Sequence, residues 1–259
     1  MDKAVIIGIG GPIGVGKSTF LNNVESDRVL VFREPAEENE MLALFYQNPG
    51  RFAAAMQFCT LCHRIRTTRA ALAAAATATR HGTALTVVVE RPFPEDYAFV
   101  LANFRAGTFP ADAFADYFLL ISDMFKELPL PNVMVRIDAP AKECIFRIST
   151  RGRACETGIG VEYMDHVHEG YEVIFALCRR MGVPCMTVDW SAFGDPHAVL
   201  AAAVADARPQ PHAWDESRLD KFEAEAFRLY THYLELAGET TAHVLAMHAD
   251  RMLLKPSQK

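Results

Sequence analysis

The feature that most constrains this chain is a glycine-rich loop, Gly11-Pro-Ile-Gly-Val-Gly-Lys-Ser18, close to the first residue of the sequence. It matches the pattern G-x-x-x-x-G-K-[ST] at every fixed position. The apolar run Ala4–Ile9 precedes it and a helix-like segment follows it, which is the context that the pattern needs. A chain that begins in this way is expected to fold as an α/β protein that binds a nucleoside triphosphate.

The loop has a direct physical role. Its glycines let successive backbone N–H groups wrap around phosphate oxygens, and the N-terminus of the following helix adds a favourable dipole. Lys17 is expected to reach the β- and γ-phosphates, and the Ser18 hydroxyl is expected to bind Mg²⁺. The residues predicted to contact the triphosphate here are Gly11, Gly14, Val15, Gly16, Lys17, Ser18 and Thr19.

Further apolar runs predict the remaining strands. Each is short, continuous and rich in Val and Ile, which is typical of parallel strands covered on both faces, and long helical segments separate them. The expected fold class is therefore α/β, with a five-stranded parallel sheet and helices on both faces. The predicted strands are Ala4–Ile9, Val29–Phe32, Ala84–Val89, Val133–Ile137 and Pro184–Val188.

Two helices can also be predicted from composition. The alanine-rich stretch Arg51–Arg80 contains no Pro or Gly and predicts one long helix, and Ala198–Ala207 predicts another after the fifth strand. The sequence Pro209-Gln-Pro211 then interrupts the pattern. We expect one α/β domain over residues 1–208 and a C-terminal helical extension over 209–259, which either packs on the domain or binds a partner.

Composition bears on the kind of partner. The formal net charge is −6 and only 22% of the residues are charged, which does not favour a nucleic-acid or membrane surface. The first apolar run is too short for a secretory signal or a membrane span. The six cysteines are expected to be free thiols, because the Cys59–His63 segment lacks a second metal-ligand pair. These features predict an intracellular, cytoplasmic protein.

Charged residues follow two of the predicted strands. Glu34 comes just after the second strand, and Glu90 and Arg91 come just after the third. The carboxyl ends of parallel strands meet at one edge of the sheet, so these groups are expected to lie near the bound triphosphate. Phosphoryl transfer to an alcohol needs positioning, charge neutralisation and a proton acceptor. We expect Glu34 to be the base, Glu90 to hold Mg²⁺ directly or through water, and Arg91 to orient the acceptor and the incoming phosphate.

Together these motifs resemble the deoxynucleoside kinase family, over Val5 to Val188. The resemblance implies a P-loop kinase fold, with the deoxynucleoside kinase domain over residues 1–208. The resemblance implies that ATP and a deoxynucleoside are the small-molecule substrates, and that the protein is a homodimer. It assigns the general base to Glu34, the sugar 3′-hydroxyl to Tyr46, and the base edge to Gln57. Arg64 lies two helical turns beyond Gln57 and matches the family's base-reading arginine. Asp96 matches an aspartate of the deoxycytidine and purine kinases.

A later segment resembles the family's arginine-rich lid. Arg147, Arg151 and Arg153 match the arginines that close over ATP, and Glu156 matches the lid glutamate that reaches the 3′-hydroxyl. Arginines on a lid neutralise charge on the transferring phosphoryl group, and the closed lid excludes water. The resemblance thus implies catalytic roles for Lys17, Glu34, Arg91, Arg151 and Arg153, and ATP contacts for Arg147 and Arg151.

The sequence departs from the family pattern in two places. Pro92 stands where a serine is usual, which stiffens the backbone after Arg91 and removes a hydroxyl and an N–H. The segment after Glu34 is short and lacks the tryptophan of animal members, and so looks more like the bacterial deoxyadenosine and deoxyguanosine kinases. Phe93 and Phe58 are then the candidates for stacking on the base.

The resemblance also ranks the bases. Arg64 and Asp96 suit purines and deoxycytidine, because an unpaired buried polar group costs about 1–3 kcal/mol and so discriminates between substrates. We expect purine deoxynucleosides first, deoxycytidine second and thymidine third. Two alternatives stay open at this point: a thymidine or thymidylate type of kinase, and a non-catalytic nucleotide-binding accessory protein.

Overall fold

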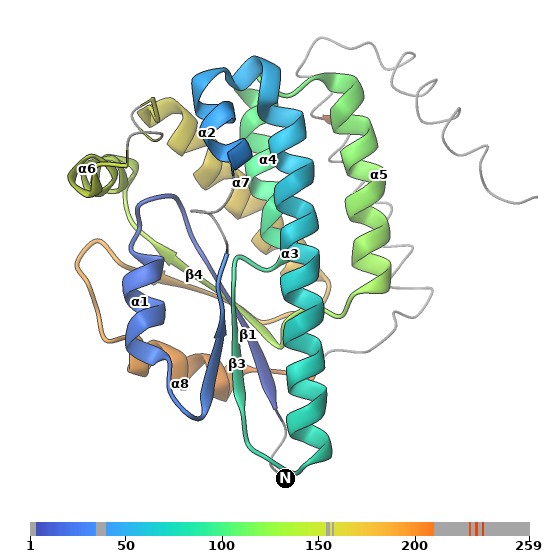
Figure 1. The fold of residues 1–259 in the computed structure, drawn as a ribbon, viewed down its shortest axis with the longest axis vertical. Helices are drawn as coiled ribbons and strands as arrows, with labels where there is room; N and C mark the ends of the chain where they lie inside the picture. Colours follow the sequence, from blue (N-terminus) through green and yellow to red (C-terminus); the bar gives the residue numbers. More distant parts are fainter. Residues whose placement is uncertain are drawn as a thin grey trace, which may run out of the picture.

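The computed structural model describes residues 4–34, 40–153, 156 and 158–209, together with positions 228, 231, 232 and 235. Among these residues, five strands form one parallel sheet in the order β2-β3-β1-β4-β5 (Figure 1). This confirms the predicted α/β class. The strands are β1 (Val5–Gly10), β2 (Val29–Phe32), β3 (Thr86–Glu90), β4 (Val133–Asp138) and β5 (Cys185–Asp189).

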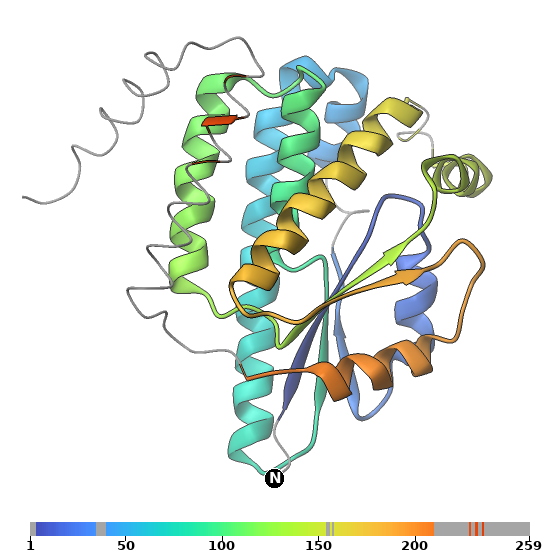
Figure 2. The same cartoon turned by 180° about the vertical axis from the view of Figure 1, so that it is seen from behind.

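Helices cover both faces of this sheet (Figures 1 and 2). The helices α1 (Lys17–Val24) and α8 (Pro196–Asp206) pack together on one face, where Phe20 and Trp190 lie in a buried apolar cluster. A thicker helical layer covers the other face. Its members are α2 (Glu40–Gln47), α3 (Pro49–Arg80), α4 (Asp96–Arg105), α5 (Ala111–Glu127) and α7 (Val161–Arg180). The helix α6 (Ala141–Arg151) follows β4 and starts the predicted lid segment.

The long helix α3 begins earlier than predicted. Asn48 caps it by accepting a hydrogen bond from the Arg51 backbone N–H at 3.2 Å, and Pro49 occupies the first turn. Proline is compatible with that position because the first N–H groups of a helix have no partner inside the helix. The segment Asn48-Pro-Gly50, which could also be read as a turn, therefore caps and begins the helix. One continuous helix then carries Gln57 and Arg64 on the same buried face.

The helix α4 lies at the centre of the helical layer. All its residues from 96 to 104 are buried, and it packs most closely against α7. A Cβ atom added to Gly170 of α7 would lie 2.4 Å from the Ala98 carbonyl oxygen, so only glycine allows this approach. The close packing places the first residue of α4, Asp96, where solvent does not reach it.

Some predictions extend beyond the described residues. The predicted extension is described only at Arg228, Thr231, His232 and Glu235, each of which is helical, so the division at residues 208 and 209 stays a prediction. The five described cysteines are free thiols. No helix in the described part of the chain combines the length and apolar character that crossing a membrane requires.

Candidate active site

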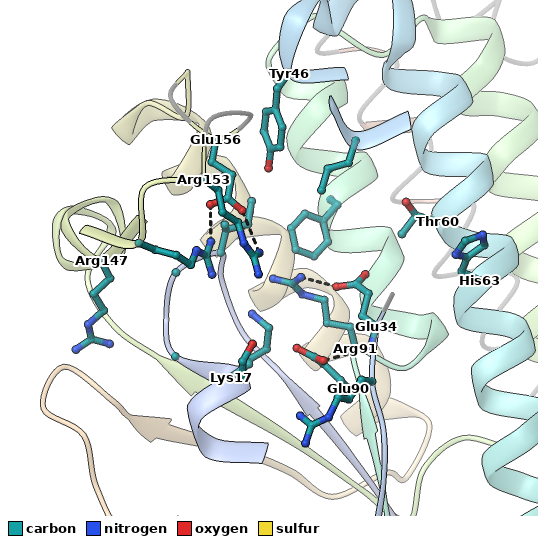
Figure 3. Close-up of a pocket in the computed structure, with 18 of the residues that line it drawn as sticks. Lys17, Glu34, Tyr46, Thr60, His63, Glu90, Arg91, Arg147, Arg153 and Glu156 are labelled. Carbon is teal, nitrogen blue, oxygen red and sulfur yellow. Dashed lines mark hydrogen bonds and ion pairs between the residues drawn. The ribbon is translucent and has the colours of Figure 1, made fainter. Parts of the chain in front are cut away.

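A cavity of about 720 Å³ lies at the C-terminal ends of β1 and β3, where open α/β sheets gather their ligand-binding residues (Figure 3). Its walls come from the glycine-rich loop, α2, α3, α4, the segment after α6 and the loop between β5 and α8. Most of the predicted site residues line it: Gly14, Gly16, Lys17, Ser18, Thr19, Glu34, Tyr46, Gln57, Arg64, Glu90, Arg91, Arg147, Arg151, Arg153 and Glu156.

Contacts with β4 and α7 fix the conformation of the glycine-rich loop at Gly11. Gly11 has φ +138°, and a Cβ atom there would lie 2.1 Å from the Ile137 carbonyl oxygen, so the position requires glycine. The Tyr171 hydroxyl accepts a hydrogen bond from the Gly11 N–H at 3.0 Å and lies 2.8 Å from the Glu95 carboxylate. The loop is thereby shaped before any ligand binds.

Lys17 folds back onto the loop. Its ammonium group donates to the carbonyl oxygens of Gly11 at 3.0 Å and Pro12 at 2.8 Å. Burial lowers the pKa of Lys17 to about 7, and the nearby Arg91 charge acts in the same direction. An anion beside Lys17 would favour its charged form and restore a high pKa.

Glu34 lies at the other side of the cavity, beside Arg91 (Figure 3), and contacts Arg64 as well. Its Oε1 accepts from Arg64 Nε at 3.1 Å and from Arg64 Nη2 at 2.6 Å, while its Oε2 accepts from Arg91 Nη1 at 2.6 Å. Burial alone would raise the pKa of Glu34, but the two guanidinium groups outweigh it and lower the pKa to about 2. The Glu34 backbone N–H donates to Glu90 Oε2 at 3.2 Å, which joins the two predicted carboxylates.

Asp96 lies one layer behind this cluster. It is fully buried, does not line the cavity, and accepts a hydrogen bond from Arg64 Nη1. The Tyr117 hydroxyl donates to Asp96 Oδ2 at 2.6 Å, and the Gln57 amide nitrogen lies 3.4 Å from the same oxygen. Burial raises the pKa of Asp96 to about 6 against the effect of Arg64. In this structure Asp96 therefore positions Arg64 and Gln57, and any contact with a substrate would pass through them.

Arg91 owes its position to an unusual backbone conformation. It has φ +47°, in the left-handed region, although it carries a side chain and precedes Pro92. Such a conformation costs on the order of 1–3 kcal/mol. The Arg91 N–H donates to the Ile9 carbonyl at 2.9 Å, which ties it to β1. Its guanidinium lies 4.9 Å from the Phe99 ring, and that of Arg64 lies 5.2 Å from the same ring.

Arg147 connects three segments of the chain by hydrogen bonds at the cavity wall. Its Nε donates to Glu143 at 2.9 Å, its Nη1 to the Val15 carbonyl at 2.8 Å, and its Nη2 to the Ser191 carbonyl at 2.7 Å. Its guanidinium lies 4.5 Å from the centre of the exposed Phe193 ring. Arg147 thus joins α6, the glycine-rich loop and the loop after β5, and forms a platform with Phe193, over whose ring its guanidinium lies.

The two other lid arginines share one carboxylate (Figure 3). Arg151 Nη2 lies 2.6 Å from Glu156 Oε2, and Arg153 Nη1 lies 3.5 Å from Glu156 Oε1. Glu156 is buried, while about a third of each arginine side chain is exposed, 34% and 32% respectively. Both guanidinium groups therefore have the Glu156 carboxylate as a partner, and both arginines line the same cavity as Lys17.

This geometry combines a phosphate loop, a buried carboxylate and a set of arginines in one cavity. The family model for deoxynucleoside kinases matches residues 7–199. The chain belongs to the deoxynucleoside kinase family. Members of this family are ATP-dependent phosphotransferases that act on deoxynucleosides, so the chain is a kinase, as the sequence predicted.

Individual relatives agree with this placement. The chain is 30% identical to a deoxyguanosine kinase of Dictyostelium discoideum over 197 residues, which cover 75% of this chain and 67% of that protein. It is 25% identical to a deoxyadenosine kinase of the same organism over 203 residues, which cover 77% and 78% of the two chains. A solved structure of deoxyadenosine kinase from M. mycoides with bound dATP has the same fold, with a TM-score of 0.61 and 22% identity over 78% of this chain and 100% of that chain.

The predicted stacking phenylalanines lie elsewhere in this kinase. Phe93 is fully buried and packs edge-on against Phe125 at 5.2 Å between ring centres. Phe58 packs against Tyr117 at 5.9 Å. Neither lines the cavity, because helix packing turns both rings into the core. Phe99 lines it instead, beneath the two arginines.

Several cavity residues were not predicted. Thr60 and His63 line the cavity on the same face of α3 as Gln57 and Arg64, and the helical period of the predicted helix could have identified them. Tyr163 and Phe193 also line it. No local pattern marks Phe193, since its place depends on how the loop after β5 folds back toward the glycine-rich loop.

Proposed function

We propose that this kinase transfers the γ-phosphate of Mg²⁺-ATP to the 5′-hydroxyl of a deoxynucleoside, with purines preferred, deoxycytidine second and thymidine third. One observation carries the proposal. Glu34 is a buried carboxylate held by two arginines in the same cavity as the phosphate loop and the lid arginines. A hydroxyl placed between Glu34 and the phosphate loop would have a proton acceptor on one side and a phosphoryl donor on the other.

ATP would occupy the end of the cavity near α1. Its phosphates would accept from the loop N–H groups and draw Lys17 from the carbonyl oxygens that it now contacts. Its purine would lie against the platform of Phe193 and Arg147, because an exposed aromatic ring beside a guanidinium favours a flat partner.

The residues present fit a magnesium ion. Ser18 and Glu90 supply a hydroxyl and a carboxylate oxygen on the same cavity, and oxygen ligands of this kind are those that Mg²⁺ prefers. When bound, the ion would neutralise charge on the phosphates. Ser18 and Glu90 would hold it, and Glu90 would keep its contact with the Glu34 backbone.

The deoxynucleoside would occupy the end of the cavity near α3. Glu34 would accept the proton of the 5′-hydroxyl and Arg91 would orient that hydroxyl. Tyr46 and Glu156 line the cavity where the sugar 3′-hydroxyl is expected, and Gln57 and Arg64 line it where the base is expected.

The lid would act during transfer. Arg151 and Arg153 are paired with Glu156 and about two thirds buried, so they can exchange one anionic partner for another without a large rearrangement. On the transferring phosphoryl group they would stabilise the charge that spreads over its oxygens.

The proposed preference for purine bases rests on hydrogen-bond donors in the cavity wall. Gln57 and Arg64 carry N–H groups and line the cavity, and guanine presents two adjacent acceptors, O6 and N7, to donors of this kind. The names of the relatives, deoxyguanosine and deoxyadenosine kinases, support the purine ranking. A homodimer, a cytoplasmic location and the absence of nucleic-acid and membrane partners stay predictions.

The test is a substrate panel. The purified full chain is incubated with Mg²⁺-ATP and deoxyguanosine, deoxyadenosine, deoxycytidine, thymidine or thymidylate, and the products are quantified, with Glu34→Gln as the control. We expect monophosphates from the purines at the highest rate, and their loss in the control. Diphosphate from thymidylate alone, or no product from any acceptor, would contradict the proposal.

A further inference from the structure

We infer that Arg64 is a positioning residue that restrains the general base: it holds Glu34 until the base of the acceptor draws Arg64 away. Binding of the correct base would then release Glu34 for proton transfer. This inference rests on the proposed function, in which Glu34 accepts the proton of the 5′-hydroxyl. It adds that the base end of the cavity controls the chemical step as well as affinity.

The contacts of Glu34 motivate the idea. A carboxylate offers about four acceptor positions, and three of those of Glu34 are filled by N–H groups of Arg64 and Arg91. Two of the three come from Arg64 alone. With both guanidinium groups in contact, about one acceptor position of Glu34 is left for the 5′-hydroxyl, so the carboxylate is poorly placed to accept its proton.

The two arginines differ in what else they hold. Arg91 also donates to the Gly11 carbonyl at 3.2 Å, and its backbone is tied to β1, so it remains in place as part of the phosphate site. Arg64 has its second partner in Asp96, behind the cavity wall. A small rotation about that contact would take Nε and Nη2 from Glu34 while the guanidinium stays paired with a carboxylate.

Asp96 is suited to be the fixed point of this rotation. It is fully buried, and the Tyr117 hydroxyl donates to its other oxygen at 2.6 Å. A buried cation that lost all its carboxylate partners would pay a large desolvation cost, but Arg64 would keep one throughout. The movement therefore exchanges one hydrogen-bonded arrangement for another.

The base is the group that could draw Arg64 away. Gln57, Thr60 and His63 line the cavity on the same face of α3 as Arg64, which marks this wall as the place for a base. The two N–H groups that Arg64 now directs at Glu34 are adjacent, and adjacent guanidinium donors match the O6 and N7 acceptors of guanine. Adenine offers N7 without O6 and would compete less well.

The inference makes an unusual prediction about an acceptor without a base. The compound 1,2-dideoxyribose keeps the 5′- and 3′-hydroxyls of a deoxynucleoside and has nothing to draw Arg64 away. In the wild-type kinase, at saturating Mg²⁺-ATP, it should be phosphorylated very slowly. Adding 9-methylguanine as a separate molecule should raise its turnover in a saturable way, by about tenfold or more, which is a part of the roughly 10²–10⁴-fold that a positioned general base contributes.

A variant separates release of Glu34 from other effects. Arg64→Met combined with Asp96→Asn removes the restraint without leaving the Asp96 carboxylate unpaired. We expect it to raise the turnover of 1,2-dideoxyribose by about tenfold, to lower that of deoxyguanosine, and to abolish the response to 9-methylguanine. Asp96→Asn alone is the matched control, because it keeps Arg64 on Glu34 and should not raise turnover of the sugar. A purely structural role for Arg64 would lower turnover of both acceptors.

The outcomes are distinguishable. If the wild-type kinase phosphorylates no deoxynucleoside, the proposed function fails. If it phosphorylates deoxyguanosine but 9-methylguanine has no effect on the sugar, the inference about Arg64 fails while the function stands. The wild-type measurement decides this even if the double variant does not fold. If the double variant folds, a parallel fall of both turnovers also overturns the inference.

Discussion

Two clusters of arginine and carboxylate side chains face the same cavity but differ in burial. The acceptor cluster comprises Glu34, Arg64, Arg91 and Asp96. The exposed fractions of its side chains are 5% for Arg64, 10% for Glu34 and 11% for Arg91. In the lid cluster of Glu156, Arg151 and Arg153 the carboxylate is also buried, but the arginines are 34% and 32% exposed. The two clusters therefore differ in how far water reaches their arginines.

This difference separates two tasks that similar residues perform. A buried ion pair that loses one partner leaves an unpaired charge in a place that water reaches poorly, which is costly. A partly exposed pair loses little, because water and salt screen it. The lid cluster can therefore exchange partners easily when ATP arrives. The acceptor cluster needs a ligand with matching donors and acceptors before it changes, so selectivity is expected to reside there.

The first prediction tests the comparison through catalysis and has the largest expected effect. Glu34→Gln removes the proton acceptor and should lower kcat by about 10²–10⁴-fold. Glu156→Gln removes only a partner of the lid arginines and of the sugar, and should lower kcat/KM by about tenfold, the equivalent of one hydrogen bond to a charged group. Steady-state assays with deoxyguanosine check both variants. Equal losses in the two variants would remove the distinction.

The second prediction concerns stability. Arg64→Met leaves Glu34 with one arginine and Asp96 with none, and should lower the free energy of unfolding by about 3–5 kcal/mol. Arg151→Met removes an arginine that water already reaches and leaves Arg153 beside Glu156, so it should cost about 1 kcal/mol. Urea unfolding at neutral pH and one salt concentration measures the pair. Similar midpoints for the two variants would show that burial does not distinguish the clusters.

The third prediction uses Glu95, a carboxylate buried beneath the glycine-rich loop. Its Oε2 lies 2.8 Å from the Tyr171 hydroxyl, and its Oε1 has no hydrogen-bond partner among the described residues. Burial raises the pKa of Glu95 to about 7, whereas two bonded arginines lower that of Glu34 to about 2. Glu95 thus shows what burial does to a carboxylate without directly bonded arginines.

The sign of the resulting pH effect follows from the direction of the shift. Between pH 4.5 and 7 the folded state holds the Glu95 proton more tightly than the unfolded state, so the free energy of unfolding falls as pH rises through this range. Glu95→Gln should flatten that fall by roughly 1–3 kcal/mol. Urea unfolding of both proteins at pH 5, 6 and 7 tests this, below the range in which Lys17 acts in the opposite sense. Parallel stability curves would contradict it.

The smallest expected effect lies outside both clusters. Phe193→Leu removes the aromatic platform beside Arg147 and should raise the KM for ATP by about fivefold, since such stacking is worth around 1 kcal/mol. The KM for deoxyguanosine should not change, because Phe193 belongs to neither cluster. Leu30→Ala, an exposed position on β2 away from the cavity, is the control. A matching rise in both KM values would show that the donor and acceptor ends are not independent.

Most of the fold could be predicted from the sequence, because local patterns specify it. Continuous apolar runs predicted the parallel strands, with ends that differ from the observed ones by at most two residues. The glycine-rich loop predicted its own place between β1 and α1, since the glycine at position 11 has no room for a Cβ atom. The start of α3 was wrong by two residues, because Asn48-Pro49 is a helix-capping signal as well as a turn signal.

The site could be predicted less completely. Glu34, Glu90 and Arg91 follow strands, and parallel strands deliver their ends to one edge, so the sequence determined that these groups would meet. Only the tertiary structure decided how they are paired. The packing of α4 between its neighbours buries Asp96 behind Arg64, and the fold of the loop after β5 brings Phe193 to Arg147. These contacts join residues far apart in the sequence, and no local propensity specifies them, because they arise when separate elements compete for the same buried space.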